Sequence, residues 1–326
     1  MAGHRSRILV TGGAGFVGRP LVRRLAPEHD VLVLDALHHG GGRFTAPELA
    51  GLSLITGDVR DPATIAGAVS GFAPEIIIHL AAVHFIPDCE RDPPATIATN
   101  LVGTVNLLRA APAGCRFVLA SSGAVYRPDD QPHVEDASAL EPADIYGLTK
   151  LQAEQYLAYF ARRRELAGIA VRLFNVVGPG ETNPHLLPEI VLQLRAGQRR
   201  IRLGNTWPKR DYLHVEDAAA GFAALALGGS VPSGSFLAVN LGSGRAHSVA
   251  EILERLGAIS GIDCEIVADA DRMRAVDRPF LAADIGRIGA RFGWRPALGI
   301  DDALRDLWAR PDFSPRLTAG EPLGAG

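Results

Sequence analysis

Lysine is almost absent from this sequence of 326 residues, because only Lys150 and Lys209 among its 33 basic residues are lysines. An ammonium group is a compact charge with rotatable donors, whereas a guanidinium group is a planar fork that stays protonated. A chain that otherwise uses arginine for positive charge therefore retains lysine where arginine would not serve. Lys150 follows Tyr146 by four residues in Tyr-Gly-Leu-Thr-Lys, which makes this pair the first candidate for a functional site.

Other absences exclude whole classes of protein. The three cysteines, Cys89, Cys115 and Cys264, are scattered and form neither a metal-binding spacing nor a disulfide framework. A net charge of −3 and a pI near 6.4 give no broad basic surface for nucleic acid or an anionic membrane. Apolar runs such as 76–83 are far too short to span a bilayer, and the start runs into a strand without room for a signal peptide. We therefore expect a cytoplasmic protein without nucleic-acid or membrane partners and without a metal site.

The first half of the chain alternates apolar runs with helical segments. The runs are rich in β-branched residues and almost purely apolar, as in strands buried on both faces of a parallel sheet: Arg7–Thr11, Val31–Asp35, Leu52–Thr56, Glu75–Leu80, Arg116–Ala120 and Ile169–Phe174. The segments between them predict helices over Gly15–Leu25, Pro62–Val69, Pro94–Ala111 and Tyr146–Leu166. This alternation predicts an α/β fold with a doubly wound parallel sheet of the Rossmann type.

After residue 175 the pattern becomes less regular, and Gly178-Pro179-Gly180 marks the change. We expect a cofactor domain over residues 1–175 and a smaller mixed α/β substrate subdomain over 176–312, partly interleaved with the first. Residues 313–326 are rich in Pro and Gly and predict a flexible tail. Helices are predicted over Pro188–Ala196, Val215–Leu227, Val249–Ser260 and Asp301–Ala309, and Ser248 with Glu251 predicts a capping box.

A glycine-rich loop, Thr11-Gly12-Gly13-Ala14-Gly15-Phe16-Val17-Gly18, joins the first strand to the first helix. In this context the three glycines allow a tight turn, a close approach to a pyrophosphate and close helix–sheet packing, and the helix N-terminus faces the phosphates. Asp35 ends the second strand, where a carboxylate can accept both ribose hydroxyls of an adenosine. It would repel a 2′-phosphate, and Ala36-Leu37-His38 offers no arginine to bind one, so the cofactor predicted is NAD. Asp58-Val59 ends the third strand and suits the adenine amine.

Tyr146 and Lys150 fall on one predicted helix, where positions i and i+4 lie about 5–6 Å apart at Cβ. An ammonium group beside a phenol favours its anion, so the spacing predicts a tyrosine pKa lowered towards neutrality. Taken alone, the pair fits an exposed Tyr/Lys contact equally well.

The motifs combine in a recognisable order: the glycine loop, Asp35, Gly57-Asp58-Val59, His79-Leu80-Ala81-Ala82, Asn100, Ser121-Ser122, Val125-Tyr126, Tyr146-x3-Lys150, Arg172 to Gly180 and Arg210 to Asp217. Over about residues 7–310 the chain resembles the extended short-chain dehydrogenase/reductases, in particular the nucleotide-sugar epimerases and dehydratases, and most of all the UDP-glucose 4-epimerases.

The resemblance implies roles for individual residues. Tyr146 would be the acid/base, Lys150 would bind the nicotinamide ribose, and Ser122 would hydrogen-bond the reacting hydroxyl, with Ser121 as its structural neighbour. Cofactor contacts are implied for Gly12, Gly15, Phe16, Val17, Gly18, Asp35, Asp58, Val59, Leu80, Ala81, Ala82, Asn100, Tyr146, Lys150 and Phe174. Contacts with a nucleotide-diphosphate sugar are implied for His84, Ser122, Asn175, His185, Leu186, Arg210 and Arg274. His84 fits a packed histidine equally well, and Trp207 suits either stacking on a base or packing.

Two positions restrict the chemistry. Related dehydratases, decarboxylases and 3,5-epimerases place an ionisable residue after the catalytic serine or threonine, whereas this chain has Gly123 and Ala124. The resemblance then implies hydride transfer at one carbinol, which predicts a nucleotide-sugar 4-epimerase, with an NADH-dependent 4-ketosugar reductase as the alternative. A non-catalytic NAD sensor is disfavoured because the motifs are intact. Arg127 departs from the glycine usual in the family, and the helices around 94–111 and 146–166 imply a homodimer built on a four-helix bundle.

Overall fold

The computed structural model describes residues 4–38, 44, 45, 48, 52–181, 183, 185–269 and 279–310. Arg274 and the predicted tail at 313–326 lie outside the described residues.

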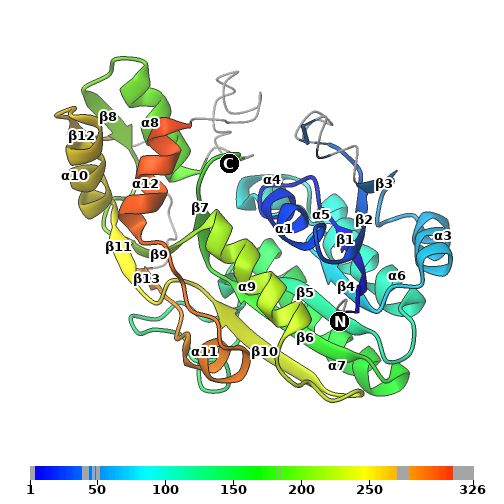
Figure 1. The fold of residues 1–326 in the computed structure, drawn as a ribbon. Coiled ribbons are helices and arrows are strands. Elements are labelled where there is room, and N and C mark those ends of the chain that lie inside the picture. Colours follow the sequence, from blue (N-terminus) through cyan, green and yellow to red (C-terminus); the bar gives the residue numbers. More distant parts are fainter. Residues whose placement is uncertain are drawn as a thin grey trace.

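A seven-stranded sheet forms the centre of the molecule, in the order β10-β6-β5-β4-β1-β2-β3, with every neighbouring pair parallel (Figure 1). Its strands are β1 (Arg7–Thr11), β2 (Asp30–Asp35), β3 (Ser53–Thr56), β4 (Ile76–His79), β5 (Arg116–Ser122), β6 (Ala167–Leu173) and β10 (Phe236–Leu241). The chain runs outwards in one direction from β1 and in the other from β4, so the strand order reverses between these two strands. This arrangement confirms the predicted doubly wound sheet, and ligands of such sheets bind outside the carboxyl ends of the strands near the reversal.

Helices cover both faces of this sheet. One face packs against α1 (Gly18–Leu25), α9 (Val215–Leu227) and α11 (Gly286–Phe292), and the other against α3 (Pro62–Phe72), α6 (Gly103–Ala110) and α7 (Ile145–Arg164). Along β1, Ile8 and Val10 contribute to the first core and Leu9 to the second. Side chains alternate between the faces of a strand, so a strand covered on both faces is apolar throughout.

The chain after residue 175 builds a smaller unit around β9 (Lys209–His214), at one end of the large sheet (Figure 1). β9 pairs with β7 (Asn175–Val177), β11 (Ala246–Ser248) and β13 (Phe280–Leu281), and β8 (Arg200–Leu203) pairs with β12 (Glu265–Ala268). A third core lies among these strands and α8 (Leu186–Arg195), α10 (Val249–Ser260) and α12 (Ile300–Ala309). The predicted Ser248/Glu251 capping box starts α10.

The helix predicted over Pro94–Ala111 differs from the structure in an informative way. α5 (Pro93–Ile97) and α6 are joined by a π-helical turn, Ala98–Val102, with Asn100 inside it. A π-bulge adds one residue to a helical turn and is common at functional sites. β10 belongs to the large sheet and α9 packs on one of its faces, although both follow residue 175. The domain boundaries of the sequence analysis remain a prediction.

Candidate active site

The glycine loop between β1 and α1 needs glycine at both ends. Gly12 has φ +72°, and a Cβ on it would lie 2.6 Å from the backbone nitrogen of Ala81. A Cβ on Gly18 would lie 2.2 Å from the carbonyl oxygen of Gly12. The loop therefore turns tightly against the residues after β4 while α1 starts directly over it, which is the geometry that presents helix N–H groups to a phosphate.

Asp35 ties the end of β2 to the glycine loop. Its Oδ2 accepts a hydrogen bond from the Ala14 backbone at 2.9 Å, and its Oδ1 accepts one from Leu37 at 2.8 Å. Leu37 has a φ of +56°, in the left-handed region that residues other than glycine rarely adopt. The Asp35 carboxylate therefore stabilises an uncommon turn. Asp35 is half-buried and lies beside the loop predicted to bind the cofactor pyrophosphate.

Replacing Asp35 with alanine is expected to weaken NAD binding by about 1.5–3 kcal/mol, the scale of hydrogen bonds to a charged acceptor. The substitution removes the acceptor predicted for the ribose hydroxyls and also the observed acceptor of the Ala14 backbone N–H. The check is calorimetric titration with NAD, with Asp30→Ala at the exposed opposite end of β2 as the matched control. A wild-type preference for NADP would contradict the role assigned to Asp35.

Asp58 lies after β3, where its carboxylate accepts two hydrogen bonds from the guanidinium group of Arg60. Arg60 donates to Asp58 Oδ2 from Nε at 2.9 Å and from Nη2 at 2.6 Å, and these side-chain hydrogen bonds lower the Asp58 pKa. Val59 is buried, and a Cβ on Gly103 would lie 2.6 Å from its Cγ2. Arg60 was not among the predicted site residues, and its position next to Asp58 makes it a further candidate for the adenine end of the site.

The segment after β4 is held by buried polar groups. His79 bridges Thr11 Oγ1 at 2.6 Å and Thr104 Oγ1 at 2.9 Å, and burial lowers its pKa to about 3. Asn100 accepts from the Val83 backbone N–H and donates to the Val83 carbonyl, each at 2.8 Å. Its amide nitrogen also donates to Thr149 Oγ1 at 3.2 Å. The π-helical turn thus points Asn100 at the backbone that follows Leu80, Ala81 and Ala82.

Tyr146 lies in the first turn of α7, facing Ser122 at the end of β5. Asp144 caps the helix by accepting from Gly147 N at 2.7 Å. A Cβ on Gly147 would lie 2.5 Å from the Ala124 carbonyl oxygen, so only glycine lets the helix start approach the turn after β5 this closely. The Ser122 side chain lies close enough to lower the pKa of Tyr146. The structure thereby brings together two of the three predicted catalytic residues.

Lys150, the third, is buried one turn further along α7. Its Nζ donates to the Ala120 carbonyl at 2.8 Å and lies 5.7 Å from the centre of the Tyr146 ring. Burial lowers the pKa of Lys150 to about 8.

The prediction that Lys150 lowers the tyrosine pKa towards neutrality is wrong for this structure. Burial raises the pKa of Tyr146, and the nearby Ser122 side chain offsets this only in part. The reason is that spacing along a helix fixes proximity, whereas desolvation of the phenol depends on what surrounds it.

The turn after Ser122 is buried and carries no ionisable side chain at Gly123 or Ala124. Gly123, Ala124 and Val125 form a short 3₁₀ turn, and all three are buried. A Cβ on Gly123 would lie 3.2 Å from the ring of Phe174, which is tighter than ordinary van der Waals contact. The ring of Phe174 therefore occupies the space beside Gly123.

Beneath the catalytic residues lies a buried polar network that the sequence analysis did not identify. Glu154, one turn after Lys150, accepts from Ser121 Oγ at 2.5 Å and forms a two-point ion pair with Arg172 at 3.1 and 2.8 Å. Arg172 also donates to the Tyr126 hydroxyl at 3.0 Å, which in turn donates to Asn240 Oδ1 at 2.7 Å. The network thus connects α7, β5, β6 and β10 directly below the Ser122–Tyr146 pair.

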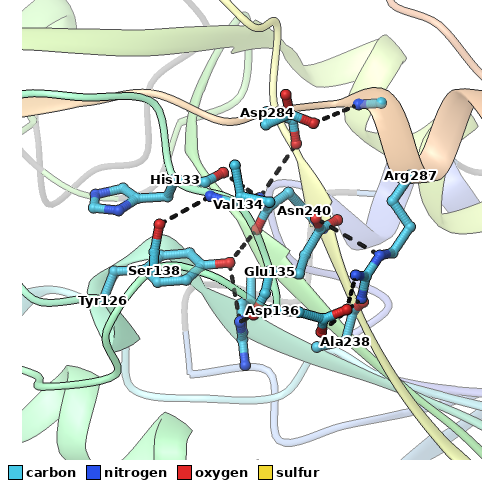
Figure 2. A network of polar contacts seen from close by, with 12 residues as sticks. Tyr126, His133, Val134, Glu135, Asp136, Ser138, Ala238, Asn240, Asp284 and Arg287 are labelled. Atoms are coloured by element: carbon cyan, nitrogen blue, oxygen red, sulfur yellow. Dashed lines mark hydrogen bonds and ion pairs between the residues drawn. The ribbon is translucent and has the colours of Figure 1, made fainter.

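Figure 2 shows how the network continues towards the second half of the chain. The Asn240 backbone donates to Glu135 Oε1 at 2.9 Å, and its side-chain amide donates to the His133 carbonyl at 2.7 Å. Arg287 of α11 pairs with Asp136 and lies 3.7 Å from Glu135. Each charge here has a partner of opposite sign, as buried polar networks require. The sequence did contain a signal for Glu154: Tyr146, Lys150 and Glu154 are spaced four residues apart and so fall on one face of the predicted helix.

The predicted substrate residues are distributed around the smaller unit. His84 follows β4, His185 and Leu186 begin α8, Asn175 is exposed at the start of β7, and Arg210 is half-buried on β9. Trp207 is 55% exposed, which disfavours the packing role. Arg127 is also exposed, and its backbone N–H donates to Ala139 O at 2.8 Å. These roles remain predictions.

A cleft lies between the two halves of the chain, beside the glycine loop. Gly15, Phe16 and Arg19 line one side, and Pro179, Gly180 and His214 line the other. The segment at 178–180, identified from sequence as a boundary, thus faces the loop predicted to hold a pyrophosphate.

Comparison with known proteins decides the family. The profile described as the NAD dependent epimerase/dehydratase family matches residues 8–242. The chain belongs to this family. UDP-glucose 4-epimerase of Corynebacterium glutamicum is 32% identical over 323 residues, covering 93% of this chain and 95% of that protein. GDP-6-deoxy-D-mannose reductase of Pseudomonas aeruginosa is 28% identical over 311 residues, covering 92% and 95%. The crystal structure of UDP-glucose 4-epimerase from Brucella ovis in complex with NAD matches with a TM-score of 0.81 at 27% identity, covering 94% and 98%.

Membership of this epimerase/dehydratase family confirms the resemblance, the fold class and NAD as the cofactor. In the part of the chain that the structure describes, no helix combines the length and apolar character needed to cross a membrane.

Proposed function

We propose that this protein catalyses reversible, redox-neutral 4-epimerisation of a nucleotide-diphosphate sugar, on a UDP-hexose, its uronate or its N-acetylamino relative. The observation that carries the proposal is the turn after Ser122, where Gly123 packs on Phe174 and Ala124 is buried. Neither residue can move a proton to or from carbon. The site therefore supports chemistry at a hydroxyl-bearing carbon that needs only hydride transfer and one proton transfer.

The residues divide this work between them. NAD, when bound, supplies the acceptor and then the donor of the hydride. Tyr146 exchanges the proton of the C4 hydroxyl, and Ser122 hydrogen-bonds to Tyr146 and to that hydroxyl. Lys150, anchored on the Ala120 carbonyl, places a buried positive charge beside the phenol and the nicotinamide ribose. For the substrate diphosphate we propose Asn175, Arg210 and Arg274, because guanidinium groups match phosphate geometry.

One observation favours a second candidate, the NADH-dependent 4-ketosugar reductase. The same Ser122, Tyr146 and Lys150 would serve a single reduction, and a reductase is among the relatives of similar length. Support for the epimerase comes from Asp35, which suits a retained NAD, and from the 4-epimerase among the relatives. A non-catalytic sensor would not need the buried lysine or a serine placed beside Tyr146.

Incubating the purified protein with a panel of UDP- and GDP-sugars, without added cofactor, distinguishes the candidates. We expect protein-bound NAD and interconversion of two C4 epimers, detected by NMR of the products. Activity confined to a 4-keto sugar, with one NADH oxidised per product, would replace the epimerase with the reductase.

We further propose a cytoplasmic homodimer. Cys89, Cys115 and Cys264 are all free thiols, which suits a reducing compartment. Large apolar side chains on α5, its π-helical extension and α7 are more than two-fifths exposed, namely Ile97, Val102, Leu148, Tyr156 and Tyr159. These helices contact one another, and pairing their exposed faces between two copies would cover this surface.

A further inference from the structure

Two histidines and a glutamate converge beside the cleft, outside the catalytic trio. His84 follows β4, whereas Glu181 and His185 lie on the segment that leads into α8. Each offers one ligand atom, and these three atoms lie within 4.8 Å of one another. Glu181 is 3% exposed, and both histidines are partly buried. Gly180, the residue before Glu181, lines the cleft next to the glycine loop.

Neighbouring groups orient these three side chains. The Asn183 amide nitrogen lies 2.9 Å from His84 Nε2, and the Asn183 backbone donates to Glu181 Oε1 at 3.2 Å. The His185 ring packs edge-on against Phe85, with ring centres 5.4 Å apart. These contacts hold the three side chains in place beside one another.

We propose that His84, Glu181 and His185 form a binding site for one divalent transition-metal ion of the zinc class. Imidazole and carboxylate ligands suit Zn²⁺, Co²⁺ and Fe²⁺, whereas Mg²⁺ and Ca²⁺ require six or more oxygen ligands. Ligand atoms on a tetrahedral Zn²⁺ lie about 3.3 Å apart for bonds of about 2.0–2.1 Å. The three atoms lie within 4.8 Å of one another, so a closure of at most about 1.5 Å would bring them to this spacing.

A metal at this position would link the segment after β4 to the smaller unit. His84 belongs to the segment that Asn100 holds in place, and Glu181 and His185 belong to the smaller unit. Three protein ligands leave the fourth position of a tetrahedral ion for water or a substrate oxygen. Binding would also stabilise the folded chain, since an ion that binds only the native state raises its melting temperature. This inference stands independently of the reaction proposed above and departs from the expectation that the chain has no metal site.

The test uses the untagged full chain, freed of metal with a chelator and then titrated with Co²⁺ and, separately, Zn²⁺. We expect one Co²⁺ per chain with a visible absorption spectrum, and one Zn²⁺ with a raised melting temperature. His84→Ala, Glu181→Gln and His185→Ala should each weaken binding at least about tenfold, since even outer-shell losses cost 10–100-fold.

His247→Ala is the matched control, because His247 is also partly buried and lies 3.6 Å from the carboxylate of Glu251. It should bind Co²⁺ like the wild type. NAD titration and thermal melting of each metal-free variant show that it is folded. Absence of stoichiometric Co²⁺ and Zn²⁺ binding, or binding that all three substitutions leave unchanged, would overturn the proposal. Activity lost in these variants without any metal bound would assign the cluster to direct contact with substrate instead.

Discussion

Replacing Tyr146 with phenylalanine is expected to lower turnover at least about 10²-fold, the lower scale for a positioned acid/base. The change removes only the phenolic oxygen, whose pKa the nearby Ser122 side chain lowers. The ring remains, so its contact with Lys150 and the packing of α7 against β5 should persist. Initial rates with the nucleotide sugar found active in the panel, together with NAD titration, provide the measurement.

Tyr156→Phe is the matched control for this variant, because Tyr156 lies on the same helix but is 44% exposed. It loses the same atom and should retain the wild-type rate. A Tyr146→Phe enzyme with near-normal turnover and intact NAD binding would remove Tyr146 from the chemistry.

Replacing Glu154 with glutamine is expected to destabilise the protein by about 3–5 kcal/mol, the cost of breaking a buried ion pair by removing one charge. The side chains of Glu154 and Arg172 are only 4% and 3% exposed, so water cannot replace the lost charge. Ser121 would also lose its charged acceptor beside Ser122. Urea unfolding followed by far-UV circular dichroism measures the loss.

Glu265→Gln is the comparison, since Glu265 pairs with Arg200 on the surface and both side chains are more than 60% exposed. Exposed pairs contribute about 0–1 kcal/mol, so this variant should unfold near the wild-type midpoint. Equal midpoints for the two variants would show that the Glu154 network does not stabilise the fold.

Six strands of the large sheet, β1 to β6, could be predicted from sequence because each carries its own signal. β1, β2 and β4, for example, are short, apolar and followed by a helix or a functional motif. β10 could not be assigned in this way, because no residue near Phe236–Leu241 in the sequence indicates that this strand pairs with β6 rather than with the smaller sheet. The choice depends on partners that are remote in sequence.

In the candidate site, too, features set by the local sequence could be predicted and features set by the surrounding structure could not. The predicted proximity of Tyr146 and Lys150 depends on helix geometry alone and is present, whereas the tyrosine pKa depends on desolvation and was predicted in the wrong direction. Glu181 was missed because its neighbour His84 lies almost one hundred residues earlier. Asn100 contacts the backbone after β4, and its location in a π-helical turn, which the sequence did not indicate, depends on how α5 and α6 meet.

The position of β10 has a consequence for biosynthesis. The edge of the sheet beside β6 stays open until the ribosome has made residues 236–241, long after the glycine loop, Tyr146 and Lys150 have emerged. An open edge strand offers N–H and C=O groups that pair readily with other chains. A nascent or truncated chain ending near residue 175 would therefore carry every predicted catalytic residue and leave β6 as the unpaired edge strand, whereas in the completed fold β10 covers β6 and becomes the edge.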